Sequence, residues 1–178
     1  AGGKIKIFVM APTLTQRETV ELAQRLDVDY TVWMSKGFHI LPTPPTTDWC
    51  GLYFRGPDTV IAQALEQGMA KEHDVYVVGK MDWDYLPPKT QVEILRRVSA
   101  GAGIVFINPV KEHKHHQIIK KQKVLDASFI TSAMPATLIP GFNDWKTTVN
   151  AYAFGKGRVV FLDDADEHLP FQAGQHRP

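Results

Sequence analysis

The chain has 178 residues, with 20 Lys and Arg against 19 Asp and Glu and a hydrophobic fraction of 44%. This composition predicts one globular domain, which can bury about 70% of its unfolded surface without a disulfide or a metal to hold its core. The net charge of +1 excludes the basic field of a nonspecific nucleic-acid binder. No apolar run approaches the roughly 18 residues that a membrane-spanning helix needs.

Strands and helices are predicted to alternate through the first part of the sequence. Near-continuous apolar runs are typical of strands that are covered on both faces, and between them apolar residues recur at helical spacing. The predicted strands are 4–10, 29–34, 74–79 and 104–107, and the predicted helices are 15–26, 58–72 and 87–100. This order predicts a parallel sheet with right-handed crossovers and helices on both faces.

The remaining segments are less regular. Residues 36–57 are rich in Pro, Gly and Thr and predict a long irregular excursion. Residues 113–125 are predicted to be helical and 129–131 to form a short strand. Two strands, 148–154 and 158–162, flank a glycine-bounded turn and predict an antiparallel hairpin that finishes the sheet.

These elements together predict the fold class. We expect a flavodoxin-like, doubly wound three-layer α/β sandwich, with a mostly parallel sheet and a C-terminal antiparallel hairpin. A single domain is predicted over residues 1–165, and residues 166–178 lack periodicity and are expected to fray. Residues 1–3 carry neither an initiator Met nor a signal-peptide pattern, so the chain is expected to be a piece of a longer protein. Its single cysteine leaves the cellular compartment unknown.

Three segments carry a resemblance to a known family. They are DVYVVG at 74–79, AGAGIVFI at 100–107 and FGKGRVVFL at 154–162. Together they resemble the class I glutamine amidotransferase-like superfamily over about residues 4–163. More narrowly, they are similar to the noncatalytic amidotransferase-like domains of large carbohydrate-active enzymes, such as the trimerisation domain of some β-galactosidases, and to trehalose-utilisation-type proteins.

The resemblance also indicates where a catalytic member would carry its nucleophile. That residue is a Cys in a Gly-x-Cys-x-Gly elbow directly after the fourth strand, where this chain has Asn108 and Pro109. Neither side chain can attack an acyl carbon, Pro109 offers no N–H to an oxyanion hole, and no Gly permits the close turn. The only thiol, Cys50, lies in the irregular segment and is interpreted as a packed bystander. The family's His-x-Glu pair is not matched by residues 166–168, which read Asp-Glu-His.

Candidate contact residues lie in the loops at the carboxyl ends of the strands, where open α/β sheets bind their ligands. Aromatic side chains there can stack on sugars or anchor an interface, or they can simply pack locally, and the sequence leaves these alternatives open. The candidates for ligand or interface contact are Trp49, Tyr53, Trp83, Tyr85 and Asn108.

An enzymatic alternative uses loop carboxylates rather than a thiol. Asp82 and Asp84 follow the third strand, and with Asp144 they could serve a hydrolase of the trehalose-utilisation type. The same two carboxylates do not make a phosphorylated receiver site, because the first strand is not followed by the acidic pair that would hold Mg²⁺.

A flavin-binding alternative combines the hydroxyl-rich loop after the first strand with Trp83 and Tyr85. Gln16 and Glu18 stand where a flavodoxin phosphate loop has a Gly and a hydroxyl, and Glu18 would repel a phosphate. Glu18 is better interpreted as part of a capping box at the start of the first helix. The histidines of 113–116 are interleaved with lysine, and they predict a solvated polar face rather than a metal site.

The resemblance, together with the missing elbow, implies a noncatalytic domain of a larger, carbohydrate-active protein, which serves subunit assembly or shapes the mouth of a neighbouring active site. No cofactor and no metal are expected. The expected partners are identical subunits or other domains of the parent protein, with carbohydrate as a candidate ligand and no nucleic acid.

Overall fold

The computed structural model describes residues 3–12, 16–35, 58–128 and 147–164. Within these ranges it contains seven strands, four α-helices and one 3-10 helix. The strands are β1 (Ile5–Pro12), β2 (Val28–Ser35), β3 (Val75–Val78), β4 (Gly103–Ile107), β5 (Val124–Leu125), β6 (Thr147–Phe154) and β7 (Gly157–Asp164). The helices are α1 (Gln16–Arg25), α2 (Asp58–Met69), α3 (Pro88–Ala100), α4 (Lys114–Lys120) and the 3-10 helix η4 (Trp83–Tyr85).

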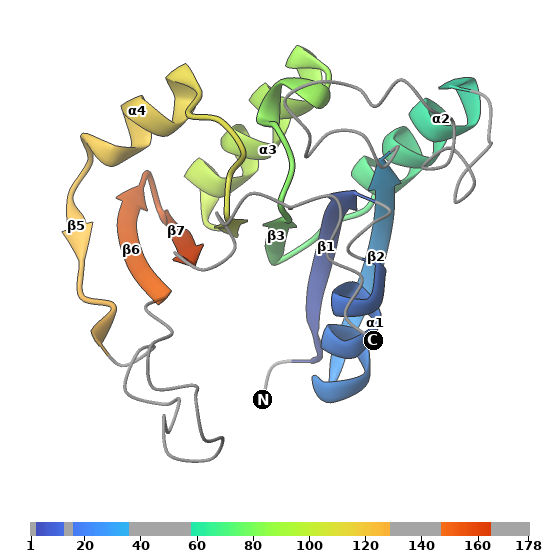
Figure 1. Ribbon diagram of the computed structural model, residues 1–178, viewed down its shortest axis with the longest axis horizontal. Helices are drawn as coiled ribbons and strands as arrows, with labels where there is room; N and C mark the ends of the chain where they lie inside the picture. Colours follow the sequence, from blue (N-terminus) through green and yellow to red (C-terminus); the bar gives the residue numbers. More distant parts are fainter. Residues whose placement is uncertain (1–2, 13–15, 36–57, 129–146, 165–178) are drawn as a thin grey trace, which may run out of the picture.

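All seven strands belong to one sheet, in the order β2-β1-β3-β4-β7-β6-β5 (Figure 1). The first five strands in this order pair in parallel, and β6 runs antiparallel to both β7 and β5. The predicted α/β class, the mostly parallel sheet and the C-terminal antiparallel pair are therefore confirmed.

The C-terminal part of the sheet differs from the sequence prediction in two ways. The hairpin does not finish the sheet, because β7 inserts beside β4 and β5 forms the outer edge beyond β6. The predicted helix over 113–125 is wrong at its end. The helix ends at Lys120, and Val124 and Leu125 pair with Tyr152 and Ala151 of β6. These residues gain sheet hydrogen bonds that no local pattern specifies.

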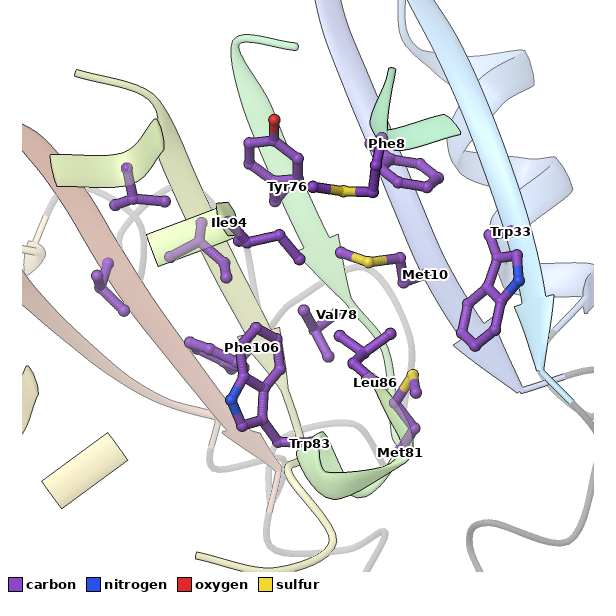
Figure 2. Close-up of a cluster of buried hydrophobic side chains, with 14 of the residues drawn as sticks. Phe8, Met10, Trp33, Tyr76, Val78, Met81, Trp83, Leu86, Ile94 and Phe106 are labelled. Carbon is purple, nitrogen blue, oxygen red and sulfur yellow. The ribbon is translucent and has the colours of Figure 1, made fainter. Parts of the chain in front are cut away.

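Alternating residues of β1 point to two different clusters of apolar side chains, as the period of a strand requires. Phe8 and Met10 belong to the larger cluster, which also takes side chains from α2, α3 and α4. Ile7 and Val9 belong to a smaller cluster, against which Leu22 of α1 packs. Figure 2 shows part of the larger cluster, in which Val78 of β3 and Phe106 of β4 lie near Leu86 and Trp83 of the loop that follows β3.

Helix α3 shows why the central part of the fold follows the sequence pattern closely. Pro88 occupies the first turn, where its missing N–H costs nothing. Gly101 ends the helix with a φ of 135°, and its N–H reaches the Val98 carbonyl at 3.0 Å. Ile94 and Val98, a turn apart, are fully buried in the larger cluster.

Strands β3 and β4 position the candidate site. They are parallel neighbours, with Val78 beside Phe106 near their carboxyl ends. The two loops that follow them, residues 79–87 and 108–113, therefore start at the same edge of the sheet. No helix among the described residues is long and apolar enough to span a membrane.

Candidate functional site

Two ionic contacts join the loops that leave β3 and β4. The Asp84 carboxylate accepts from Nζ of Lys111 at 3.0 Å, and its other oxygen lies 3.1 Å from Nε2 of His113. The sequence separates Asp84 from these partners by more than twenty residues, but parallel pairing of β3 with β4 makes them neighbours. The candidate site at this edge therefore contains Asp84, Lys111 and the histidines of α4.

The 3-10 helix η4 decides which way the side chains of its loop point. Oδ1 of Asp82 caps it by accepting from the Asp84 N–H at 2.9 Å. At its other end, the Gln91 side-chain amide donates to the carbonyls of Trp83 and Leu86 at 3.0 and 2.9 Å. The turn is thus held from both ends by side chains, and Asp82 has a structural role in it.

Trp83 and Tyr85 point in opposite directions from η4. Trp83 is 1% exposed and meets Phe106 edge-on at 5.2 Å, whereas Tyr85 is 47% exposed. Figure 2 shows the Trp83 ring among the core side chains beside Phe106. Of the two interpretations of Trp83, the structure therefore favours local packing, and Tyr85 alone of this pair faces solvent.

Asn108 stands directly after β4, at the position where the resembling family carries its nucleophile. Its N–H donates to the Leu162 carbonyl at 2.8 Å, its side chain is 3% exposed, and its φ is +44°. Asparagine tolerates the left-handed region better than other residues with a side chain. Asn108 therefore adopts a left-handed backbone without being a glycine.

The three histidines at the start of α4 are structural. His113 caps the helix, because its Nδ1 accepts from the His115 N–H at 3.1 Å and its N–H donates to Nδ1 of His116 at 3.3 Å. His116 is 1% exposed and lies edge-on to Phe106 at 4.6 Å. The predicted solvated polar face is therefore wrong for His116. His116 and Ile119 are three residues apart and both are buried, so this spacing on one face of the helix is the sequence signal for the burial of His116.

Burial and charge set the protonation states of this cluster. Burial, with His113 and Lys120 nearby, lowers the pKa of His116 to about 4. Burial, with His113 and Lys114 nearby, also lowers the pKa of His115. The hydrogen bond from Lys111 lowers the pKa of Asp84. At neutral pH the imidazoles of His115 and His116 are therefore neutral, and Asp84 is ionised. A carboxyl that acts as a general acid needs a raised pKa instead.

A hollow lies at the opposite end of the sheet, where no sequence motif predicts a site. Its volume is about 450 Å³. Acidic and basic side chains line it. Two of them are fixed by hydrogen bonds to the backbone, because Asp74 accepts from the Lys6 N–H and Arg97 donates to backbone carbonyls. Burial and the nearby Arg97 and Lys71 lower the pKa of His73 in its wall.

Several predicted site residues lie outside the described part of the chain. They are Trp49, Cys50, Tyr53, Asp144, the hydroxyl-bearing loop 13–15 and residues 166–168. Among the residues that the structure describes, no three His, Cys, Asp or Glu side chains are grouped so that they could hold a metal ion.

No family model and no curated protein matches the chain.

Proposed function

We propose that this chain is a noncatalytic amidotransferase-like domain of a larger, carbohydrate-active protein and that its work is assembly. It would contact identical subunits or other domains of the parent protein. In this proposal the fold is a flavodoxin-like, doubly wound three-layer sandwich. Two observations support that description. The strand order includes β2-β1-β3-β4, and α1 packs in the smaller apolar cluster whereas α2 and α3 pack in the larger one.

The single observation that carries the proposal is Asn108. It follows β4 directly, where the resemblance places the nucleophile of catalytic members, and its amide side chain cannot attack an acyl carbon. Its own N–H is bonded to the Leu162 carbonyl, and Pro109 has no N–H. The turn therefore supplies neither a nucleophile nor the backbone donors of an oxyanion hole.

The loop carboxylates support the enzymatic alternative less well. Asp82 is used as the cap of η4, and Asp84 is paired with Lys111 and His113. A glycosidase needs one carboxylic acid with a raised pKa, whereas the pKa of Asp84 is lowered. The flavin alternative loses one of its two aromatic residues, because Trp83 is packed inside the core.

Activity assays test the noncatalytic part of the proposal. The purified chain should release no ammonia from glutamine and should hydrolyse no thioester or ester substrate above the buffer rate. Cys50→Ala serves as the matched variant and should give the same result. Any hydrolysis that this substitution abolishes would contradict the proposal. In the full-length parent protein, Asp82→Asn and Asp84→Asn should leave the processing of sugars unchanged, and a loss would favour the hydrolase.

A further inference from the structure

Imidazole nitrogens link helix α4 to η4 and close the first turn of α4. We propose that His113, His115 and His116 form a proton-sensitive latch, and that mild acid releases α4 together with β5 while the rest of the sheet stays folded. This inference concerns the conformation of the chain and does not depend on the proposed function.

Each of the three histidines uses Nδ1 as a hydrogen-bond acceptor. Nδ1 of His113 accepts from the His115 N–H, Nδ1 of His116 from the His113 N–H, and Nδ1 of His115 from Nε1 of Trp83 at 3.1 Å. A nitrogen that accepts an N–H carries no proton of its own, so all three rings must be the neutral Nε2–H form. Protonation at Nδ1 would place two N–H groups against each other at every one of these contacts.

None of the three donors can reverse its role. Two are backbone N–H groups and the third is an indole N–H, and none of them has a lone pair to offer. One of the three contacts joins different parts of the molecule, because the Trp83 bond links α4 to η4. The other two close the first turn of α4. Protonating the rings would therefore open the cap of the helix and its link to the loop after β3 together.

The charged groups around the latch oppose further positive charge on balance. Lys111 comes from the loop after β4, and Lys114 and Lys120 come from α4 itself. The acidic groups are Asp84 on the loop after β3 and Glu112, and each already pairs with a lysine. The strands beneath contribute Phe106, Phe161 and Tyr152, of which only the phenol is titratable.

Asp84 fixes the His113 ring in its present orientation. It accepts from Nε2 of His113, and a further proton on that ring would have to sit on Nδ1, where the His115 N–H is bound. His116 has no such acceptor, since its Nε2 is buried without a hydrogen-bond partner among the described residues. Burial keeps its ring neutral at pH 7, with a pKa of about 4.

The remaining attachments of α4 and β5 are small. Ile119 is buried in the larger cluster, and Nζ of Lys120 lies 5.2 Å above the Phe161 ring. Strand β5 has two residues at the edge of the sheet, and its Val124 is 69% exposed. Figure 1 shows α4 and β5 together at one end of the molecule, beside β6. Their release would leave β1, β3, β4 and β7 paired as before.

Amide NMR of the ¹⁵N-labelled chain tests the latch directly. Between pH 7 and pH 4 the cross-peaks of residues 114–125 and of the Trp83 indole N–H should move to the positions of an unfolded segment. The cross-peaks of α3 and β1 should keep their folded positions until lower pH. The proposal is overturned if residues 114–125 stay folded throughout this range, or if every element is lost at one midpoint.

A double variant, His113→Asn with His115→Asn, separates the latch from other acid effects. The Asn side-chain oxygen takes the place of Nδ1 as an acceptor and does not titrate in this range. The number of protons coupled to release should fall, which lowers the slope of its pH dependence. His73→Asn is the matched control, because His73 stacks on Phe8 at 5.0 Å, in a different part of the molecule, and its pKa is also lowered by burial. The control should leave the midpoint of α4 unchanged. An unchanged slope in the double variant, or an equal change in the control, would overturn the proposal.

Discussion

Nε1 of Trp83 donates to Nδ1 of His115 at 3.1 Å, and this bond joins the loop after β3 to helix α4. The same indole packs edge-on against Phe106 of β4. Trp83 therefore connects three elements that are distant in the sequence. The sequence offers Trp83 as a candidate surface contact, but in the structure its side chain is part of the core.

Trp83→Phe should weaken this connection while an aromatic side chain still fills most of the space of the indole. The substitution keeps an aromatic ring, but it removes the indole N–H and leaves Nδ1 of His115 without its donor. We expect the free energy of unfolding to fall by about 1–3 kcal/mol, measured by urea denaturation. Val92→Ala on the exposed face of α3 is the control and should change stability by less than about 0.5 kcal/mol. Equal effects of the two substitutions would contradict the role given to Trp83.

The stability of the chain should decrease in mild acid. The pKa values of His73, His115 and His116 are all lowered in the folded state, that of His116 to about 4. The unfolded chain, with ordinary histidine pKa values near 6.5, therefore binds more protons below that pH. The histidine contribution is fully present above about pH 6.5 and is lost as the pH falls toward about 4. Urea denaturation at several pH values measures this loss, and a free energy of unfolding that stays constant or rises between pH 6.5 and 4.5 would refute the prediction.

Two adjacent arginines of α3 should differ sharply in their contribution to stability. Both bind Glu93, but only Arg97 also donates to the carbonyls of Met69 and Lys71, at 2.7 Å each, and so joins α3 to the end of α2. Lysine cannot reproduce this forked set of donors. Arg97→Lys should cost about 1–3 kcal/mol, whereas Arg96→Lys, at an exposed pair, should cost less than about 1 kcal/mol. Thermal and urea unfolding of the two variants provide the comparison, and a larger loss for Arg96→Lys would show that the bridge is unimportant.

Gly157 should tolerate no side chain. A Cβ there would collide with the carbonyl oxygens of Val98 and Ala102, which are backbone atoms at the end of α3 and just beyond it. Gly103 begins the neighbouring strand β4, and a Cβ there would make only an ordinary contact with Cγ2 of Val75 at 3.6 Å. Gly157→Ala should cost about 3 kcal/mol or more, and Gly103→Ala about 1 kcal/mol or less. Denaturation midpoints that match in the two variants would contradict this close approach.

Tyr85 should be a surface anchor of the assembly. It is 47% exposed beside the paired loops after β3 and β4, and Tyr30 on the edge strand β2 is 50% exposed and serves as the control. Tyr85→Ala should weaken self-association at least tenfold in sedimentation experiments, as the loss of an aromatic contact at an interface does. The melting temperature should stay within about two degrees of that of the unmodified chain. If Tyr30→Ala weakens association more than Tyr85→Ala does, the interface lies at β2 instead.

The segment from β3 to β4 could be predicted from the sequence almost to the residue. Its two strands are short apolar runs that are buried in the centre of the sheet, and α3 between them has Pro88 in its first turn and Gly101 at its end. These signals are local and agree with the tertiary structure, so the local pattern is sufficient.

The edge of the sheet could not be predicted in the same way. β5 forms because Val124 and Leu125 find partners in β6, and β7 reaches β4 from more than fifty residues away. Such pairings depend on which strand edges are free once the rest of the sheet has formed, and the periodicity of a segment contains no information about them.

The sequence predicts that the loops after β3 and β4 start at the same edge of the sheet, but it does not predict the contacts between them. The carboxyl ends of β3 and β4 do bring Asp84, Lys111 and His113 together. In the three-residue turn η4, Trp83 is buried and Tyr85 is exposed. His116 is buried although the residues around it in the sequence are polar. Both outcomes depend on backbone direction within a single turn, which residue types alone do not specify.

Native mass spectrometry of the purified chain tests the central claim, a noncatalytic domain that serves assembly, most directly. A single spectrum reports the number of subunits and any additional bound mass. The account predicts a dimer or trimer whose mass is that of the polypeptide alone. A monomer that carries the mass of a flavin, a metal ion or a sugar would contradict it.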